Sequence, residues 1–213
     1  MLISSYNPSQ MGDVLVTIIN PDKSTQASEQ KQDVTRIYEP KTDLTLGYNF
    51  FKLSEYLPDL KEQGQVFLTT AQVAILNDHL EAVGFKAELE ADLSPKFVVG
   101  KVLEMTEHPD SDHLHITKVK VDNEQVLQIV CGAPNVDVNQ HVVVAKVGAM
   151  MPSGALIWPG KLRGVKSDGM LCAARELALP NAPQKRGILV LDADEFPVGQ
   201  AFDFEKGRQL FIN

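Results

Sequence analysis

Short apolar segments separated by turns fill most of the chain after residue 96. Val and Ile are frequent in these segments, and Gly, Pro, Asn or Asp stands between them. The segments are FVVGKVLEM (97–105), LHITKVKVD (114–122), QVLQIVCG (125–132), HVVVAKVG (141–148), GALIW (154–158) and RGILVLD (186–192). Because evenly spaced short strands with such turns are typical of closed or two-layered sheets, the sequence predicts a small β-barrel or sandwich.

The second of these segments changes phase along its length. Leu114 and Ile116 would share one face of a strand, and Val119 and Val121 would share the other. A slip of one residue reverses the faces of a strand, so we expect a β-bulge near residues 117–118. Bending at a bulge is how a short sheet curls into a closed barrel.

The first 90 residues mix two periodicities. VLVTII (14–19) and QVFLTT (65–70) are short apolar runs that are typical of strands. AQVAILNDHLEAVGF (71–85) carries apolar residues at helical spacing, with Thr70 as a suitable N-cap and Gly84 as a stop. This mixture predicts a small α+β domain.

Composition divides the chain into three parts. The polar, turn-rich segment 21–33 predicts a mobile loop inside the α+β domain. An acidic run and a proline interrupt the pattern at 88–96 and mark a boundary. We therefore expect an α+β domain over residues 1–90, a β domain over residues 94–201 and a C-terminal tail over residues 202–213.

The net charge of −8 is unevenly distributed along the chain. Residues 1–93 carry 7 Lys/Arg and 14 Asp/Glu, residues 94–201 carry 11 and 12, and residues 202–213 carry 2 and 2. The acidity therefore belongs almost entirely to the first part. The near-neutral second part can still present a local basic face, and the asymmetry indicates two domains with different roles.

Two further features limit the class of protein. No window approaches the roughly 18 consecutive apolar residues that span a bilayer, and the N-terminus lacks the basic region and apolar run of a signal peptide. Cys131 and Cys172 stand alone in apolar surroundings, without a CxxC partner. The sequence predicts a cytoplasmic protein with two buried free thiols.

The segment EHPDSDHLHI (107–116) contains three of the five histidines and two aspartates. In a strand, His113 and His115 would share a face, where a metal site or a catalytic site is one interpretation. A further converging ligand is missing, because His79 and His141 lie in other segments. The proline and the aspartates are natural turn residues, so the favoured interpretation is a turn followed by a strand.

Five motifs in chain order carry a resemblance to a known family: HPDSDHL, QIVCGAPNV, VGAMMPSG, KLRGVKSDGMLCAARELAL and GILVLD. Residues 94–201 resemble the tRNA-binding OB-fold shared by the N-terminal part of the bacterial phenylalanyl-tRNA synthetase beta subunit, the C-terminal extension of some methionyl-tRNA synthetases and the endothelial-monocyte-activating-polypeptide-like proteins. With its leading α+β domain and its length, the whole chain is similar to the YtpR-type stand-alone tRNA-binding proteins. The resemblance implies a five-stranded OB barrel with a short helix, and a non-catalytic, tRNA-binding function.

The motif KLRGVKSDGM (161–170) holds the cations that we expect to contact RNA. An extended backbone would point Lys161 and Arg163 to one face, roughly 6.5–7 Å apart, a spacing comparable with that of RNA phosphates. Lys166 follows, just before a turn. Because OB-folds hold nucleic acid by cations along its backbone, we expect phosphate contacts from these three residues.

The resemblance assigns three further residues. The family's S-x-G-M motif is implicated in tRNA contact, which implies Ser167 and Met170, and Asn135 matches the family's asparagine after CGAP. The alternatives are core packing of the methionine and bonding of the asparagine within its loop. His113 stands where the family commonly has a lysine, so the resemblance places no cation there.

Other candidates lie near the end of the barrel segment. Arg175, Lys185 and Arg186 are either additional phosphate contacts or ordinary solvated charges. Residues 171–179 predict a short helix, which in an OB-fold plugs one end of the barrel. Trp158 precedes a proline at a strand end, where packing is a better explanation than stacking on a base.

The sequence supports three hypotheses on function. The first is a non-catalytic protein that contacts tRNA backbone and shape, with modest and salt-sensitive affinity. The second is a protein-interaction module that docks on an aminoacyl-tRNA synthetase. The third, an enzyme built on the histidine cluster, is the least supported, because neither cysteine has a base placed beside it. We expect no catalytic residue, metal or cofactor, and a synthetase partner and a homodimer both stay open.

Overall fold

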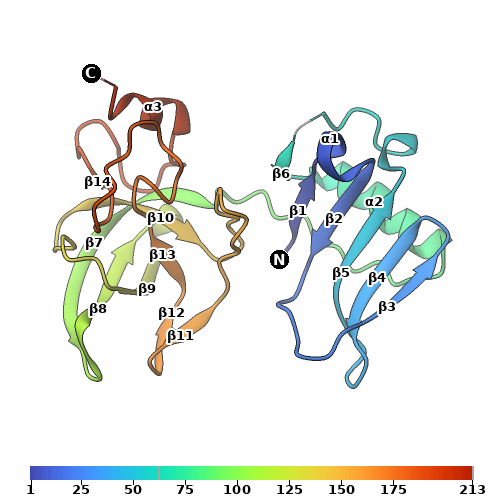
Figure 1. The fold of residues 1–213 in the computed structure, drawn as a ribbon, viewed down its shortest axis with the longest axis horizontal. Coiled ribbons are helices and arrows are strands. Elements are labelled where there is room, and N and C mark those ends of the chain that lie inside the picture. Colours follow the sequence, from blue (N-terminus) through green and yellow to red (C-terminus); the bar gives the residue numbers. More distant parts are fainter. Residues whose placement is uncertain (62, 213) are drawn as a thin grey trace. The chain divides into compact units, whose positions relative to one another are not determined.

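The computed structural model describes residues 1–61 and 63–212. The chain divides into two compact units, Met1–Ser94 and Pro95–Asn213, which are shown in Figure 1. Within the described residues, no helix is long and apolar enough to cross a membrane.

An antiparallel six-stranded sheet is the scaffold of the first unit, with the strand order β3-β4-β5-β2-β1-β6. The strands are β1 (Ile3–Tyr6), β2 (Val14–Ile18), β3 (Ala27–Lys31), β4 (Val34–Glu39), β5 (Leu44–Phe51) and β6 (Gly64–Val66). Two short helical elements connect them, α1 (Pro8–Met11) and η1 (Leu53–Glu55). A strand is therefore present within residues 14–19. Of the strand predicted at 65–70, only residues 65–66 lie in β6, and Thr70 already belongs to the following helix.

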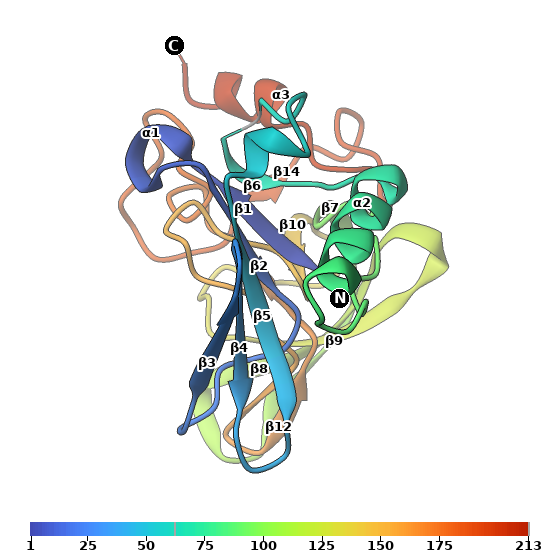
Figure 2. The same cartoon turned by 90° about the vertical axis from the view of Figure 1, so that its right-hand side faces the viewer.

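Helix α2 (Thr70–Ala82) lies along one face of this sheet (Figure 2). Its buried side chains belong to the same apolar cluster as Tyr48 and Phe50 of β5. The helix is capped by Thr69, whose hydroxyl accepts a hydrogen bond from the Gln72 N–H while the Gln72 side chain accepts one from the Thr69 N–H. The predicted α+β fold is confirmed, and the N-cap lies one residue earlier than expected.

The polar segment 21–33 is not a loop throughout, contrary to the expectation from the sequence. Strand β3 lies within it and pairs antiparallel with β4. β3 is the edge of the sheet, and its three central residues are exposed. Polar side chains suit an exposed edge, since an apolar one would pair with other chains. A search for apolar periodicity therefore misses this strand.

The second unit is built on five strands in the order β13-β10-β7-β8-β9 (Figure 1). These are β7 (Phe97–His108), β8 (Ser111–Lys120), β9 (Val126–Cys131), β10 (His141–Lys146) and β13 (Gly169–Leu171). Three more strands accompany them: β11 (Gly160–Leu162) and β12 (Val165–Ser167), which form a separate hairpin, and β14 (Val190–Leu191), which pairs with β10. The 3-10 turn η2 (Asp122–Glu124) joins β8 to β9.

The two ends of this sheet meet beside β13. The Asp168 N–H donates to the Gln128 carbonyl of β9 (2.8 Å), and the Val130 N–H of β9 donates to the Ser167 hydroxyl (3.1 Å). The sheet is thereby nearly closed on itself. A five-stranded, partly open barrel of this kind is the OB-fold, so the predicted fold class is confirmed.

The expected bulge occurs in the β7–β8 pair, but on the other strand. The register between β7 and β8 shifts at Leu103 of β7. β8 keeps its alternation, because Thr117 points inward, is fully buried and donates its hydroxyl hydrogen to the Ile129 carbonyl (2.8 Å). The phase change in the sequence reflects a buried threonine, so the bulge predicted at residues 117–118 was wrong in its position.

One stretch near the C-terminus differs from the expectation. Residues 171–179 complete β13 and then form successive turns instead of a helix, with Ala178 in the left-handed conformation (φ 52°). Phe202, which follows the segment 94–201, is 4% exposed and packs in the core of this unit. Helix α3 (Phe204–Gln209) follows directly.

Candidate nucleic-acid interface

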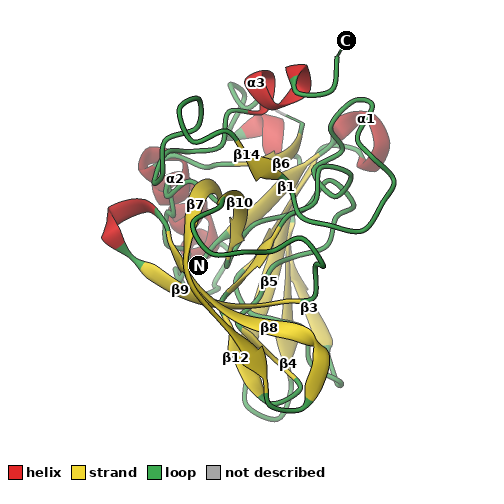
Figure 3. Ribbon diagram, turned by 90° about the vertical axis from the view of Figure 1, so that its left-hand side faces the viewer, coloured by secondary structure: helices red, strands yellow, loops and turns green. Residues whose placement is uncertain are grey.

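Two β-hairpins, β7–β8 and β11–β12, project from the same end of the barrel (Figures 1 and 3). The Arg163 guanidinium, in the turn of β11–β12, donates to the Asp110 carbonyl in the turn of β7–β8 (2.9 Å). The His108 imidazole bonds the Leu162 carbonyl (Nε2 to O, 3.1 Å). These contacts hold the two hairpin tips together.

His108 bonds both hairpins. Its Nδ1 accepts a hydrogen bond from the Asp110 N–H (3.1 Å), so its Nε2 carries the proton donated to Leu162. His113, near the start of β8, is exposed and pairs with the adjacent Asp112 (3.1 Å). In the part of the chain that the structure describes, no three His, Cys, Asp or Glu side chains gather as a metal site requires. The histidine segment is a turn followed by a strand.

The β11–β12 hairpin turns at Arg163 and Gly164, which both have positive φ (46° and 83°). Two-residue hairpin turns need such left-handed residues, and this explains the glycine. The expectation that the backbone stays extended through Arg163 was wrong, because the extended run ends at Leu162. Lys161 instead lies directly opposite Lys166. Residues opposite each other share one face, with Cβ atoms roughly 4.5–5.5 Å apart.

The charges of this lysine pair are only partly compensated. Lys166 forms an ion pair with Asp168 (2.7 Å), and its side chain is 65% exposed. Lys161 is exposed at the middle of β11. Like charges directly opposite in a hairpin repel each other. The pair therefore places two ammonium groups close together on an exposed face.

The outer face of β8 and β9 adjoins this hairpin. Lys118 of β8 donates to Gln128 Oε1 of β9 (2.8 Å), and the Gln128 amide donates to the Lys166 carbonyl (2.8 Å). Lys120 is on the same face of β8 and pairs with Glu124 (2.6 Å). We call Lys118, Lys120, Lys161 and Lys166 the lysine surface.

Two residues assigned by the resemblance are engaged within the barrel unit. The Ser167 hydroxyl accepts from the Val130 N–H (3.1 Å) and donates to the Gly169 carbonyl (3.2 Å). The Asn135 amide accepts from the Ile188 N–H (2.8 Å) and donates to the Ile188 carbonyl (2.9 Å). Both side chains join segments that are far apart in the sequence, and so they stabilise the shape of the unit.

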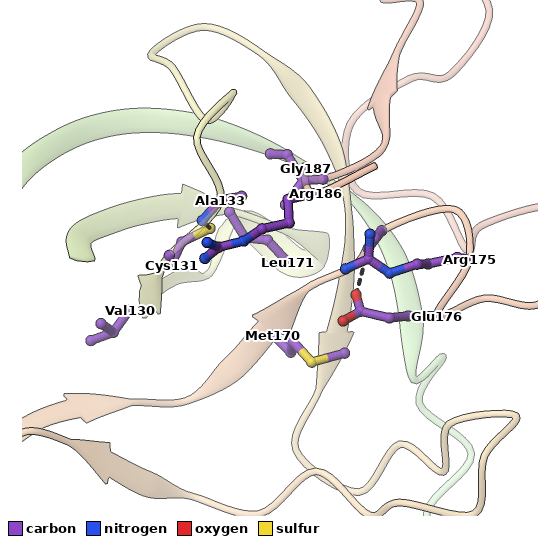
Figure 4. Close-up of a pocket in the computed structure, with 12 residues that line it drawn as sticks. Val130, Cys131, Ala133, Met170, Leu171, Arg175, Glu176, Arg186 and Gly187 are labelled. Atoms are coloured by element: carbon purple, nitrogen blue, oxygen red, sulfur yellow. Dashed lines mark hydrogen bonds between the residues drawn. The ribbon is translucent and has the colours of Figure 1, made fainter. Parts of the chain in front are cut away.

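Met170, the third such residue, lines a pocket of about 230 Å³ (Figure 4). Arg175, Glu176 and Arg186 are among the side chains that surround this pocket. Lys185 borders an adjoining hollow that shares Arg186 with it. Arg175, Lys185 and Arg186, which the sequence offered as separate candidates, thus lie around two neighbouring pockets.

The two cysteines are poorly suited to be nucleophiles. Both are free and buried. Burial raises the pKa of Cys131, and it raises the pKa of Cys172 to about 12. At neutral pH both stay protonated, and the thiol is far less reactive than the thiolate.

Two family models match the chain, one in each unit. Residues 97–201 match a model described as "Putative tRNA binding domain". Residues 21–92 match one described as "Domain of unknown function (DUF4479)". The conserved-domain match in the second unit covers the barrel and both hairpins.

Curated relatives match part or nearly all of the chain. Over 84 residues it is 52% identical to the "Phenylalanine-tRNA ligase beta subunit" of Staphylococcus epidermidis, which is 39% of this chain and 10% of that subunit. Over 200 residues it is 48% identical to the "Putative tRNA-binding protein YtpR" of Bacillus subtilis, which is 93% of this chain and 98% of that protein. Among solved structures, the C-terminal domain of Plasmodium vivax p43 is 26% identical over 55% of this chain and 74% of its own, with a TM-score of 0.30, too low to bear on the fold.

The nearly closed barrel defines an OB-fold protein, and four lysines lie on its strand β8 and its β11–β12 hairpin. The match to the Bacillus subtilis protein over nearly the full length of both chains shows the family. The chain belongs to the YtpR family.

Proposed function

We propose that the barrel unit binds tRNA without catalysing a reaction, as part of a cytoplasmic protein. OB-folds bind oligonucleotides on the face of their second and third strands, and with the loops between strands one and two and between strands four and five. Here these are the β8–β9 face, the β7–β8 turn and the segment that contains the β11–β12 hairpin. The lysine surface lies on these same elements, and this coincidence carries the proposal.

The negative net charge of the chain does not oppose this proposal. Residues 94–201 are nearly neutral, with 11 Lys/Arg and 12 Asp/Glu. At physiological ionic strength, charges more than about 8 Å away from an exposed group are largely screened. A phosphate on the lysine surface therefore interacts mainly with the local charges, which are the four lysines and the carboxylates of Glu124 and Asp168.

Phosphates and backbone shape are the features that we expect this surface to contact. Aromatic side chains that could stack on bases are scarce, because Phe196 and Phe202 are buried in the core and Trp158 is half-buried. Lysines act as point charges on phosphates and carry no base sequence information. A folded tRNA suits such a surface, since it presents phosphates from several segments at once.

Titration of fluorescently labelled bulk tRNA tests this proposal. We expect a Kd on the order of 10⁻⁴–10⁻⁶ M, with an affinity that falls steeply between about 50 and 200 mM salt as counterions are released. The tRNA recovered from the complex should be chemically unchanged. Absence of binding at about 50 mM salt would contradict the proposal.

The docking alternative has its own readout. Retention of a synthetase at high salt after removal of RNA, together with no anisotropy change on adding tRNA, would support a protein-interaction module instead.

A further inference from the structure

The pocket lined by Met170 is too small for most ligands (Figure 4). Its volume of about 230 Å³ is below the roughly 300–1,000 Å³ of pockets that hold drug-sized molecules. An occupant that stays within this pocket is therefore a single small group, such as one base.

The lining of the pocket is partly apolar. Met170, Cys131, Ala133 and Leu171 contribute to it. Met170 is half-buried and also packs against the barrel core, which limits its movement. Because a thioether is polarisable and contacts aromatic rings favourably, this lining suits the flat face of a base.

Two guanidinium groups make the surroundings of the pocket positive. Arg175 donates to the Lys185 carbonyl, which anchors one of its nitrogens and leaves its other N–H groups to a ligand. Arg186 reaches the pocket from a separate loop and is exposed. Guanidinium groups match phosphate oxygens in geometry and charge, so these two residues suit the phosphate of a nucleotide.

A carboxylate interrupts this positive pattern. Glu176 lines the same pocket, and its Oε2 accepts a hydrogen bond from the Ala173 N–H (2.7 Å), the dashed line in Figure 4. This bond fixes the carboxylate while Oε1 keeps its acceptor sites. A bare phosphate would be repelled by Glu176. A nucleotide instead supplies a phosphate for the arginines and base N–H groups for the carboxylate.

We propose that this pocket holds one unstacked nucleotide whose base carries an exocyclic amino group. The amino group donates to Glu176, the base lies against Met170, and Arg175 and Arg186 contact the phosphate. Uridine binds less well, because the matching edge of uracil presents a carbonyl oxygen to the carboxylate. The inference rests on the proposed function, and it adds contact with one unpaired base, of the kind found in RNA loops and ends.

Cytidine and uridine monophosphates test this inference, because cytosine carries the amino group where uracil carries a carbonyl oxygen, with an N–H at the neighbouring ring nitrogen. In the full chain with ¹³C-methyl methionine, identified by Met170→Leu, we expect CMP to shift the Met170 methyl resonance in a saturable way. UMP should bind about tenfold more weakly. Glu176→Gln should reduce this preference to about twofold or less, since glutamine keeps an oxygen for the Ala173 N–H but loses the charge. Arg186→Ala should weaken both nucleotides alike.

Glu195→Gln is the matched control, because Glu195 pairs with Lys206 (3.5 Å) outside the pocket lining. It should leave the CMP preference unchanged. Equal affinities of CMP and UMP for the unaltered protein, or a Met170 methyl that neither nucleotide shifts, would overturn the inference. With tRNA binding retained, these results would overturn the pocket alone. If the unaltered protein did not bind tRNA, the proposed function itself would be contradicted.

Discussion

Replacing Lys161 and Lys166 together by alanine should weaken tRNA binding about 30-fold at low salt, at roughly 1 kcal/mol for each lost contact. The two side chains lie directly opposite each other on the β11–β12 hairpin. The slope of log affinity against log salt should also fall by about 2, since each lost phosphate contact removes about one released counterion. Anisotropy titrations between about 50 and 200 mM salt measure both quantities.

The matched control is Lys23→Ala with Lys41→Ala, which makes the same change in net charge with two exposed lysines of the first unit. Because neither residue is on the barrel, affinity and salt slope should stay close to those of the unaltered protein. An equal loss in both double variants would show that net charge, and not the lysine surface, governs the binding.

Replacing Gly169 by alanine should destabilise the barrel by on the order of 3 kcal/mol. Gly169 begins β13 with φ +154°, and a Cβ there would lie 2.9 Å from the Ala145 carbonyl oxygen and 3.3 Å from the Ile129 side chain. β13 must then move away from β10, which strains the closure of the barrel. Urea unfolding followed by the fluorescence of Trp158, the sole tryptophan, reports on this unit.

Gly154→Ala separates backbone strain from lack of space. Gly154 also has positive φ (+86°), but nothing lies within 4 Å of the position of its Cβ. It should therefore cost only about 1 kcal/mol, the penalty of a left-handed alanine. Similar losses in the two variants would mean that the close approach at Gly169 contributes little to stability.

The fold was predictable where a strand is long and rich in β-branched residues. The segments 97–105, 114–122, 125–132 and 141–148 all contain strands, because apolar runs between turns depend on local sequence alone. β11 and β12 are only three residues long and largely exposed, so no periodicity marks them. Such strands exist because of their pairing partners, which a local pattern does not reveal.

For the candidate site, the sequence supplied residue types but not their geometry. The motif identifies Lys161 and Lys166 as candidate cations. The turn at Arg163, which the motif does not reveal, places them opposite each other. Asn135 bonds Ile188, which is 53 residues further along the chain. Contacts over such separations are set by the closed barrel, so the sequence could not distinguish an RNA contact from a structural bond.

Ultraviolet crosslinking of tRNA to the full chain, with mass spectrometry of the crosslinked peptides, tests most directly whether the lysine surface binds RNA. We expect crosslinks in peptides from β8, β9 and the β11–β12 hairpin, and few from Met1–Ser94. Crosslinks concentrated in the first unit, or spread evenly over both units, would contradict the account.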